Sequence, residues 1–132
     1  MTTAAAIVAT VLFVAIAAFQ LALALGAPLG AHVLGGRYPD RLPGRVRVFS
    51  AIAAVVLAGA GLVVLGRAGV VAPPPGAAVF LAPACWVIAA FLALNTLGNL
   101  RSKSRFERTV FAAATAALAV LSGYVALTGT GV

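Results

Sequence analysis

The sequence predicts an all-α fold, a polytopic membrane four-helix bundle made of two helical hairpins. Of its 132 residues, 64% are hydrophobic and only 8% are charged, whereas soluble domains carry about a quarter charged residues. Four apolar runs reach roughly the 20 residues that a helix needs to cross a bilayer. The charged residues lie mainly between these runs, so we expect a single transmembrane domain over residues 1–132.

The first two apolar runs predict helices over residues 4–26 and 44–66. The first run lacks the basic start of a secretory signal and is longer than a signal's apolar stretch, so we expect a retained helix. Gly26 suits the left-handed position that ends a helix, and Pro28 cannot continue helical hydrogen bonding. The basic loop 27–43 therefore joins the two helices of a first hairpin.

The second hairpin is predicted from helices over residues 78–101 and 105–127. The loop 101–105 between them is short and basic. Ser104 and Glu107 have the spacing of a capping box, in which the serine accepts a hydrogen bond from a free amide and the glutamate reaches back to the cap. This pair predicts where the fourth helix begins.

The distribution of basic residues predicts the orientation of the chain. Eight of the nine lie in or beside the two hairpin loops: Arg37, Arg41, Arg45, Arg47, Arg101, Lys103, Arg105 and Arg108. The proline-rich loop 67–77 between the hairpins has only Arg67. By the positive-inside rule, the chain is a multi-pass protein of the bacterial inner (cytoplasmic) membrane with cytoplasmic hairpin loops and both termini external. The asymmetry also argues against a dual-topology transporter, whose loops should be nearly balanced.

The formal net charge of +7 indicates contact with anionic lipid head groups. A nucleic-acid partner is not expected, because the basic residues do not cover a helix face with aromatic residues between them. One histidine, one cysteine and two acidic residues offer no metal-ligand set within one chain. No metal or other cofactor is therefore predicted.

Residues 26–36 contain four glycines and one proline, so they cannot form a regular helix. In the simpler interpretation, the glycines end the helix, the arginines fix the topology and a sharp turn brings the second helix alongside. In the other, the segment folds back, and its amides and the arginines form a pocket for a lipid phosphate or a small anion. The candidate residues of this pocket are Gly26, Pro28, His32, Gly35, Gly36, Arg37, Arg47 and Arg108.

Three uncharged polar residues, Gln20, Asn95 and Asn99, fall near the inner ends of the first and third helices. Such side chains usually hydrogen-bond across a helix bundle. The sharper alternative is a polar inner vestibule where they meet His32, Glu107 and the arginines, with Glu107 paired to a basic residue of the first loop. His32 could also sense pH or bind a metal, although a lone histidine more often has a structural role.

The segments FQLALALGAPLG, LPGRVRVFS, LN and SRFER resemble those of a group of small four-span integral membrane proteins of high-GC bacteria. The resemblance covers most of the chain. It rests on Gln20, Gly26, Ala27, Pro28, Gly30, Gly35, Gly36, Leu42, Pro43, Arg47, Asn95, Ser104, Glu107 and Arg108. It implies the fold and the membrane location but brings no activity or functional residue to this chain.

These features favour a non-enzymatic structural, accessory or regulatory membrane subunit that binds lipid or another membrane protein. The alternative is a small-molecule or ion transporter or channel built as a homo-oligomer, because four helices leave little room for a pore within one chain. An enzyme is not expected, since the spans contain no motif for nucleophilic or metal chemistry.

Overall fold

The computed structural model of the protein describes residues 1–130, which form a bundle of four long helices. These are α1 (Thr2–Ala24), α2 (Gly44–Arg67), α3 (Ala78–Leu100) and α4 (Ala112–Thr128). Each span is long and apolar enough to cross a membrane, and that of α4 includes the preceding π-helical turn η3 (Glu107–Phe111). The predicted all-α four-helix bundle is confirmed, and the described residues contain no strand.

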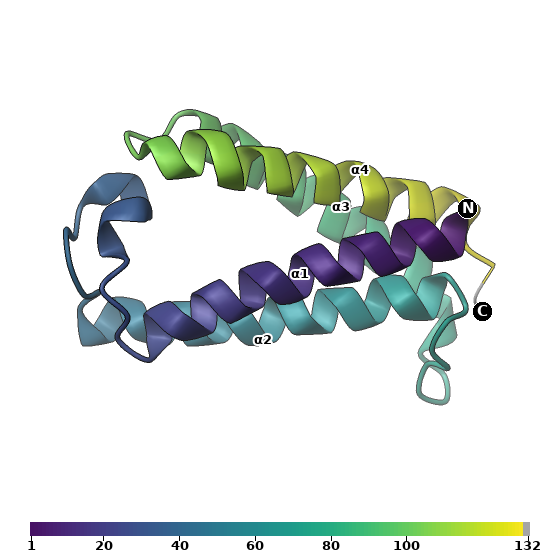
Figure 1. Cartoon of the computed structure of the whole chain (residues 1–132). Coiled ribbons are helices and arrows are strands. Elements are labelled where there is room, and N and C mark those ends of the chain that lie inside the picture. The colour runs from purple at the N-terminus through teal and green to yellow at the C-terminus, as the bar shows by residue number, and fades with distance from the viewer. Residues whose placement is uncertain (131–132) are drawn as a thin grey trace.

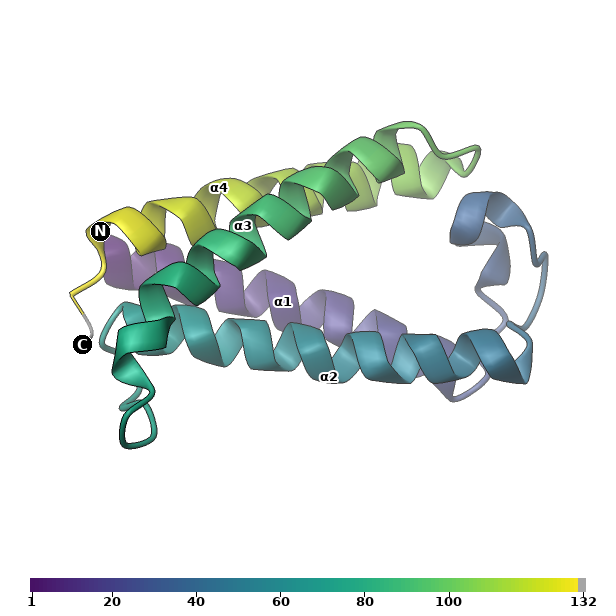
Figure 2. The same ribbon diagram turned by 180° about the vertical axis from the view of Figure 1, so that it is seen from behind.

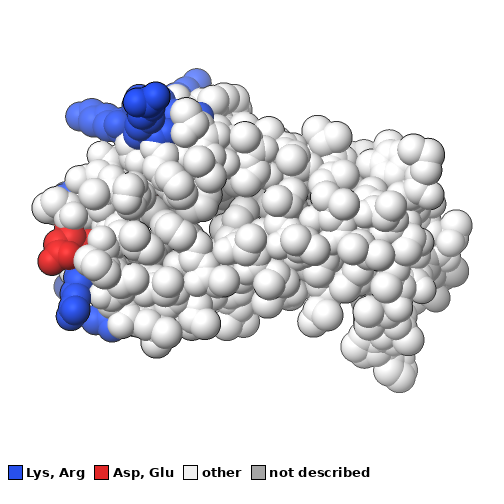
Figure 3. Space-filling model, viewed as in Figure 1, with Lys and Arg blue, Asp and Glu red and all other residues white. Residues whose placement is uncertain are grey.

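The bundle consists of two antiparallel hairpins, α1–α2 and α3–α4, that converge at one end and diverge at the other (Figures 1 and 2). The end where they converge, called the packed end, holds the start of α1, the end of α4 and the loop 68–77. The opposite end, called the basic end, holds the two hairpin loops, 25–43 and 101–106. On the face shown in Figure 3, the Lys and Arg side chains gather at the basic end.

Close packing holds the converging ends together. Phe13, Val64, Leu118 and Val125 come from α1, α2 and α4, and each is at most 1% exposed. Gly61 of α2 faces α1, because a Cβ atom there would lie 3.4 Å from Cγ2 of Thr10. At the packed end, the hydroxyl of Thr2 in α1 donates a hydrogen bond to the hydroxyl of Thr128 in α4.

The outward faces of all four helices are apolar and exposed. Val55 of α2, Val87 of α3 and Val120 of α4 are 73%, 69% and 72% exposed. Together with Val11 of α1, they belong to a surface that water would not favour but lipid hydrocarbon would. The chain is accordingly described as a multi-pass membrane protein.

The loop after α1 folds into the space between the diverging hairpins. It forms two short 3₁₀ turns, η1 (Gly30–His32) and η2 (Leu34–Gly36). Val33 and Leu42 of this loop are buried with Leu23, the last buried residue of α1. Residues 25–43, called the plug, are thus a packed part of the fold at the basic end.

Candidate functional site

The plug is held in its shape by its own backbone. Gly30 donates its N–H to the carbonyl of Asp40 at 2.8 Å, which closes the segment into a loop. A Cβ atom on Gly30 would overlap the carbonyl oxygens of Tyr38 and Asp40, so only glycine fits there. Gly36, with φ +74°, donates its N–H to the carbonyl of Val33 at 2.9 Å. Pro28 lies exposed in the same loop.

Glu107 joins the second hairpin to the plug. Its Oε1 accepts a hydrogen bond from the N–H of Leu34 at 2.8 Å, and its Oε2 accepts one from the N–H of Gly35 at 3.0 Å. The hydroxyl of Ser102 also donates to Oε2. Leu34 and Gly35 have positive φ angles of 51° and 67°, and consecutive amides in such a turn form an anion-binding concavity. The amides predicted to bind an external anion are therefore occupied by a carboxylate of the same chain.

The predicted capping box is half formed. Ser104 Oγ accepts from the N–H of Glu107 at 3.4 Å and donates to the carbonyl of His32 at 2.8 Å. The return bond is absent within residues 1–130, because the N–H of Ser104 donates to Ser102 Oγ at 3.0 Å. The Glu107 side chain serves the plug instead of its own helix. Nor does Glu107 form an ion pair with an arginine of the first loop anywhere in this part of the chain, which corrects the pairing expected from sequence.

Two of the candidate arginines, Arg47 and Arg108, have hydrogen-bond partners in the backbone. Arg47 donates its Nε–H to the carbonyl of Ala24 at 2.9 Å. This hydrogen bond gives a partner to a carbonyl at the C-terminal end of α1, where the helix itself supplies no donor. Its guanidinium lies 3.4 Å from the position that a Cβ on Gly26 would take, and Gly26 has φ +94°. Arg108 donates to the carbonyls of the loop residues Ser102 and Lys103, both at 3.0 Å.

Arg37 and His32 lie at the surface of the plug. The guanidinium of Arg37 is 5.9 Å from the ring centroid of Tyr38, within range of a cation–π contact. His32 is exposed, and its ring centroid is 5.3 Å from that of Phe106. Within residues 1–130 no group of three potential metal ligands gathers. The described neighbour of the His32 ring is thus the aromatic ring of Phe106 in the second hairpin.

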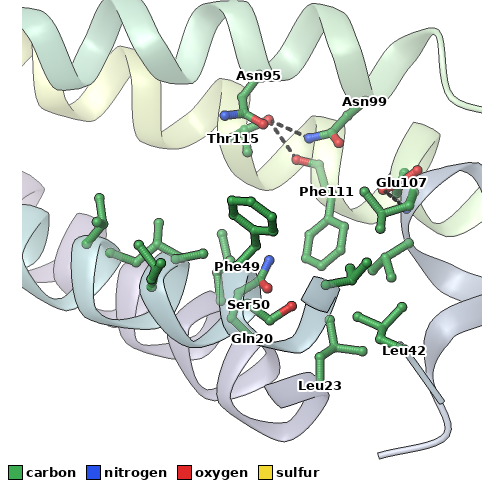
Figure 4. A pocket seen from close by; sticks show the side chains of 18 of the residues that line it. Gln20, Leu23, Leu42, Phe49, Ser50, Asn95, Asn99, Glu107, Phe111 and Thr115 are labelled. Carbon is green, nitrogen blue, oxygen red and sulfur yellow. Dashed lines mark hydrogen bonds between the residues drawn. The ribbon is translucent and has the colours of Figure 1, made fainter. Parts of the chain in front are cut away.

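A cavity of about 460 Å³, called the cleft, separates the hairpins next to the plug (Figure 4). Its wall includes Gln20 of α1, Asn95 and Asn99 of α3, and Glu107. The structure thus brings together four of the residues proposed for an inner vestibule. The other candidates do not line the cleft: Gly26, Pro28, His32, Gly35, Gly36, Arg37, Arg47 and Arg108.

The mouth of the cleft opens sideways between α2 and α3. Phe49 and Val56 of α2 and Phe91 of α3 line it and are 67%, 58% and 58% exposed. All three belong to helices that are long and apolar enough to cross a membrane, so the opening lies among exposed apolar side chains of these helices. The plug closes the side toward the basic end with Val33 and Leu42.

The polar groups of the cleft differ in their hydrogen bonding. The Thr115 hydroxyl donates to the carbonyl of Phe111 at 2.8 Å and accepts from Thr96 at 2.9 Å and from Asn99 at 3.5 Å. By contrast, the side chains of Gln20, Ser50 and Asn95 have no hydrogen-bond partner within the described residues. The wall of the cleft therefore offers amide and hydroxyl groups that have no partner in this part of the chain.

Sequence reasoning missed two polar residues of this site, Ser50 and Thr115. A signal was available for Ser50, since it is the one hydroxyl-bearing residue of the second apolar run. Thr115 gave no such signal, because helices of this kind often bond threonine to their own backbone. Its position over the cleft depends on how the hairpins are paired.

Comparisons with protein-family models, curated proteins and solved structures return no match for this chain.

Proposed function

We propose that this protein is a non-enzymatic accessory protein of the bacterial cytoplasmic membrane that binds a membrane lipid in the cleft between its hairpins. The observation that carries the proposal is the lateral mouth between Phe49, Val56 and Phe91. A cavity that opens toward hydrocarbon between spanning helices is reached by lipid without passage through water. Its volume of about 460 Å³ lies within the range of small-molecule sites.

The composition of the cleft supports binding over catalysis. Its free polar groups are the amides of Gln20 and Asn95 and the hydroxyl of Ser50, none of which is a nucleophile or proton acceptor without an activating neighbour. Glu107 is the one acidic residue in the wall, and its oxygens accept hydrogen bonds from the plug and Ser102. The cleft can therefore bind a ligand by its shape and by hydrogen bonds, but its free polar groups include no catalytic nucleophile or base.

A transport path through one chain would have to cross the packed end. There, Phe13, Val64, Leu118 and Val125 are at most 1% exposed and leave the bundle axis filled with apolar side chains. A cleft that ends against this core favours a binding site over a pore. Solute flux through vesicles containing the purified protein would contradict the proposal.

Lipid binding is tested by filling the cleft. Ala53 lines it, whereas Ala58 lies exposed on the same helix outside it. Native mass spectrometry of protein released from bilayer nanodiscs should show a retained lipid in the wild type and in Ala58→Phe. The lipid should be lost in Ala53→Phe, because the phenyl ring takes the lipid's place. Equal lipid retention by both variants would overturn the proposed site.

The proposed orientation is supported by the eight basic residues at the hairpin loops. In a Cys85→Ala background, single cysteines at Pro39 and Pro74 would report on the two sides, since both prolines are exposed. A maleimide that cannot cross the cytoplasmic membrane should label Pro74→Cys in intact cells and Pro39→Cys only after lysis. Labelling of Pro39→Cys in intact cells would reverse the orientation.

A further inference from the structure

We infer that the cleft selects a neutral lipid with hydroxyl and ester groups, of the diacylglycerol type, over an anionic phospholipid with the same chains. This inference rests on the proposed lipid site and names its ligand class. It follows from two observations: the free polar groups of the cleft are uncharged, and the basic residues stay outside it.

The charge of the wall argues against a phosphate in the cleft. No lysine or arginine lines it among residues 1–130, and the one charged side chain there is the carboxylate of Glu107. A phosphate would meet like charge in a medium of low dielectric, where an unpaired charge is costly. Arg47 is hydrogen-bonded to the carbonyl of Ala24 and lines a different, smaller hollow.

The unused hydrogen-bonding groups indicate what the ligand must carry. The side chains of Ser50, Gln20 and Asn95 reach the open space of the cleft, and none of them has a hydrogen-bond partner within residues 1–130. Polar groups in hydrocarbon without partners cost several kcal/mol. Each of these side chains both donates and accepts, which suits a ligand with a hydroxyl donor and ester acceptors.

The depth of the polar groups matches the glycerol region of a lipid. Asn95 lies five residues before the end of α3 at Leu100, about 8 Å along the helix. Gln20 lies four residues before the end of α1 at Ala24, about 6 Å along that helix. Lys and Arg side chains gather at this end of the bundle (Figure 3), where charged head groups belong. A neutral glycerol group fits below them, with its chains leaving through the mouth.

Photo-crosslinking in vesicles tests this choice of lipid. The full chain is reconstituted into phosphatidylcholine vesicles containing, at equal mole fraction, either diazirine-labelled dioleoylglycerol or phosphatidylglycerol with the same labelled chains. Mass spectrometry locates the adducts. We expect about tenfold more adducts on the cleft segments with the neutral lipid, equivalent to one decade in affinity.

Substitutions of the cleft amides test the recognition itself. Asn95→Leu and Gln20→Leu keep the approximate volume and should each lower labelling by the neutral lipid about three- to tenfold. Asn95→Gln should retain labelling, and Ala58→Phe should leave it unchanged. Helical content and monodispersity in detergent identify any variant that fails to fold, and Gln20→Leu and Asn95→Leu lie on different hairpins.

The outcomes separate this inference from the proposed function. Equal labelling by both lipids, lost in Ala53→Phe, would overturn the neutral-lipid preference and leave the lipid site standing. Labelling that neither Asn95→Leu nor Gln20→Leu reduces would also overturn the preference. Absence of adducts on the cleft with either lipid would overturn both.

Discussion

The packed end and the basic end of the bundle are built from the same four helices but filled in different ways. Toward the packed end, buried side chains such as Val64 and Val125 belong to one hydrophobic cluster that α1, α2 and α4 share. At the basic end the hairpins separate, and the plug with the adjoining cleft occupies the space between them. The hairpins therefore meet through direct side-chain packing at one end and through a folded loop at the other.

Hydrogen bonds between distant segments mark both ends. At the packed end, Thr2 Oγ1 donates to Thr128 Oγ1 at 2.9 Å, and Arg67 donates to the carbonyl of Ala126 at 3.2 Å. At the basic end, the corresponding role falls to Glu107 and Ser104, which hold the plug to the second hairpin. We therefore expect substitutions at the packed end to lower the stability of the whole bundle, and substitutions at the basic end to loosen the plug.

The largest effect is expected from Phe13→Ala at the packed end. Loss of a phenyl ring that is 1% exposed leaves a cavity among three helices and should lower the free energy of unfolding by about 3 kcal/mol. Phe49→Ala in the cleft mouth, where the ring is 67% exposed, should cost under about 1 kcal/mol. Unfolding by a denaturing detergent in mixed micelles measures both. Equal losses would mean that the two ends are packed alike.

The next effect is expected from Glu107→Gln. The neutral amide places an NH₂ group against one of the backbone N–H donors of Leu34 and Gly35, and removes a charge-assisted bond worth about 2 kcal/mol. Hydrogen exchange at these two amides should become faster. Asp40→Asn, at an exposed position of the same loop, is the control and should leave exchange at Leu34 and Gly35 unchanged. Unchanged exchange in Glu107→Gln would show that the plug does not depend on this carboxylate.

A smaller effect is expected from Gly30→Ala, which acts inside the plug. The added methyl overlaps the carbonyls of Tyr38 and Asp40 and should cost about 1 to 2 kcal/mol of local stability. Limited proteolysis within residues 30–43 measures it as faster cleavage. Gly44→Ala, where no atom lies within 4 Å of the new Cβ, is the matched substitution. Cleavage at the wild-type rate in Gly30→Ala would contradict the packed plug.

The smallest effect separates two glycines of α2. Gly61→Ala adds a methyl in ordinary van der Waals contact with Thr10 at 3.4 Å and Phe13 at 3.7 Å, so the free energy of unfolding should change by under about 1 kcal/mol. Gly59→Ala has nothing within 4 Å and should be neutral or stabilising by up to about 1 kcal/mol, because alanine favours the helix. The same detergent titration compares them. A larger loss in Gly59→Ala than in Gly61→Ala would place the helix contact on the wrong face.

The turn in residues 26–36 could be predicted from the local sequence, but the group that its amides bind could not. Glycines in residues 26–36 indicated a non-helical turn, and positive φ angles occur at Gly26, Gly35 and Gly36. The identity of the bound anion could not be predicted, because Glu107 lies more than 70 positions away along the chain. The capping-box pattern gave Glu107 a nearer partner, and the tertiary contact replaced it.

By itself, the sequence determined the spans and the breaks between them, because hydrophobic length and glycine or proline act within one segment. The angle between the hairpins, the folding of the plug and the meeting of Gln20, Asn95 and Glu107 were decided only by the tertiary structure. Lipid surrounds every helix face about equally well, so hydropathy does not choose which faces meet. Close packing and a few hydrogen bonds between distant segments make that choice.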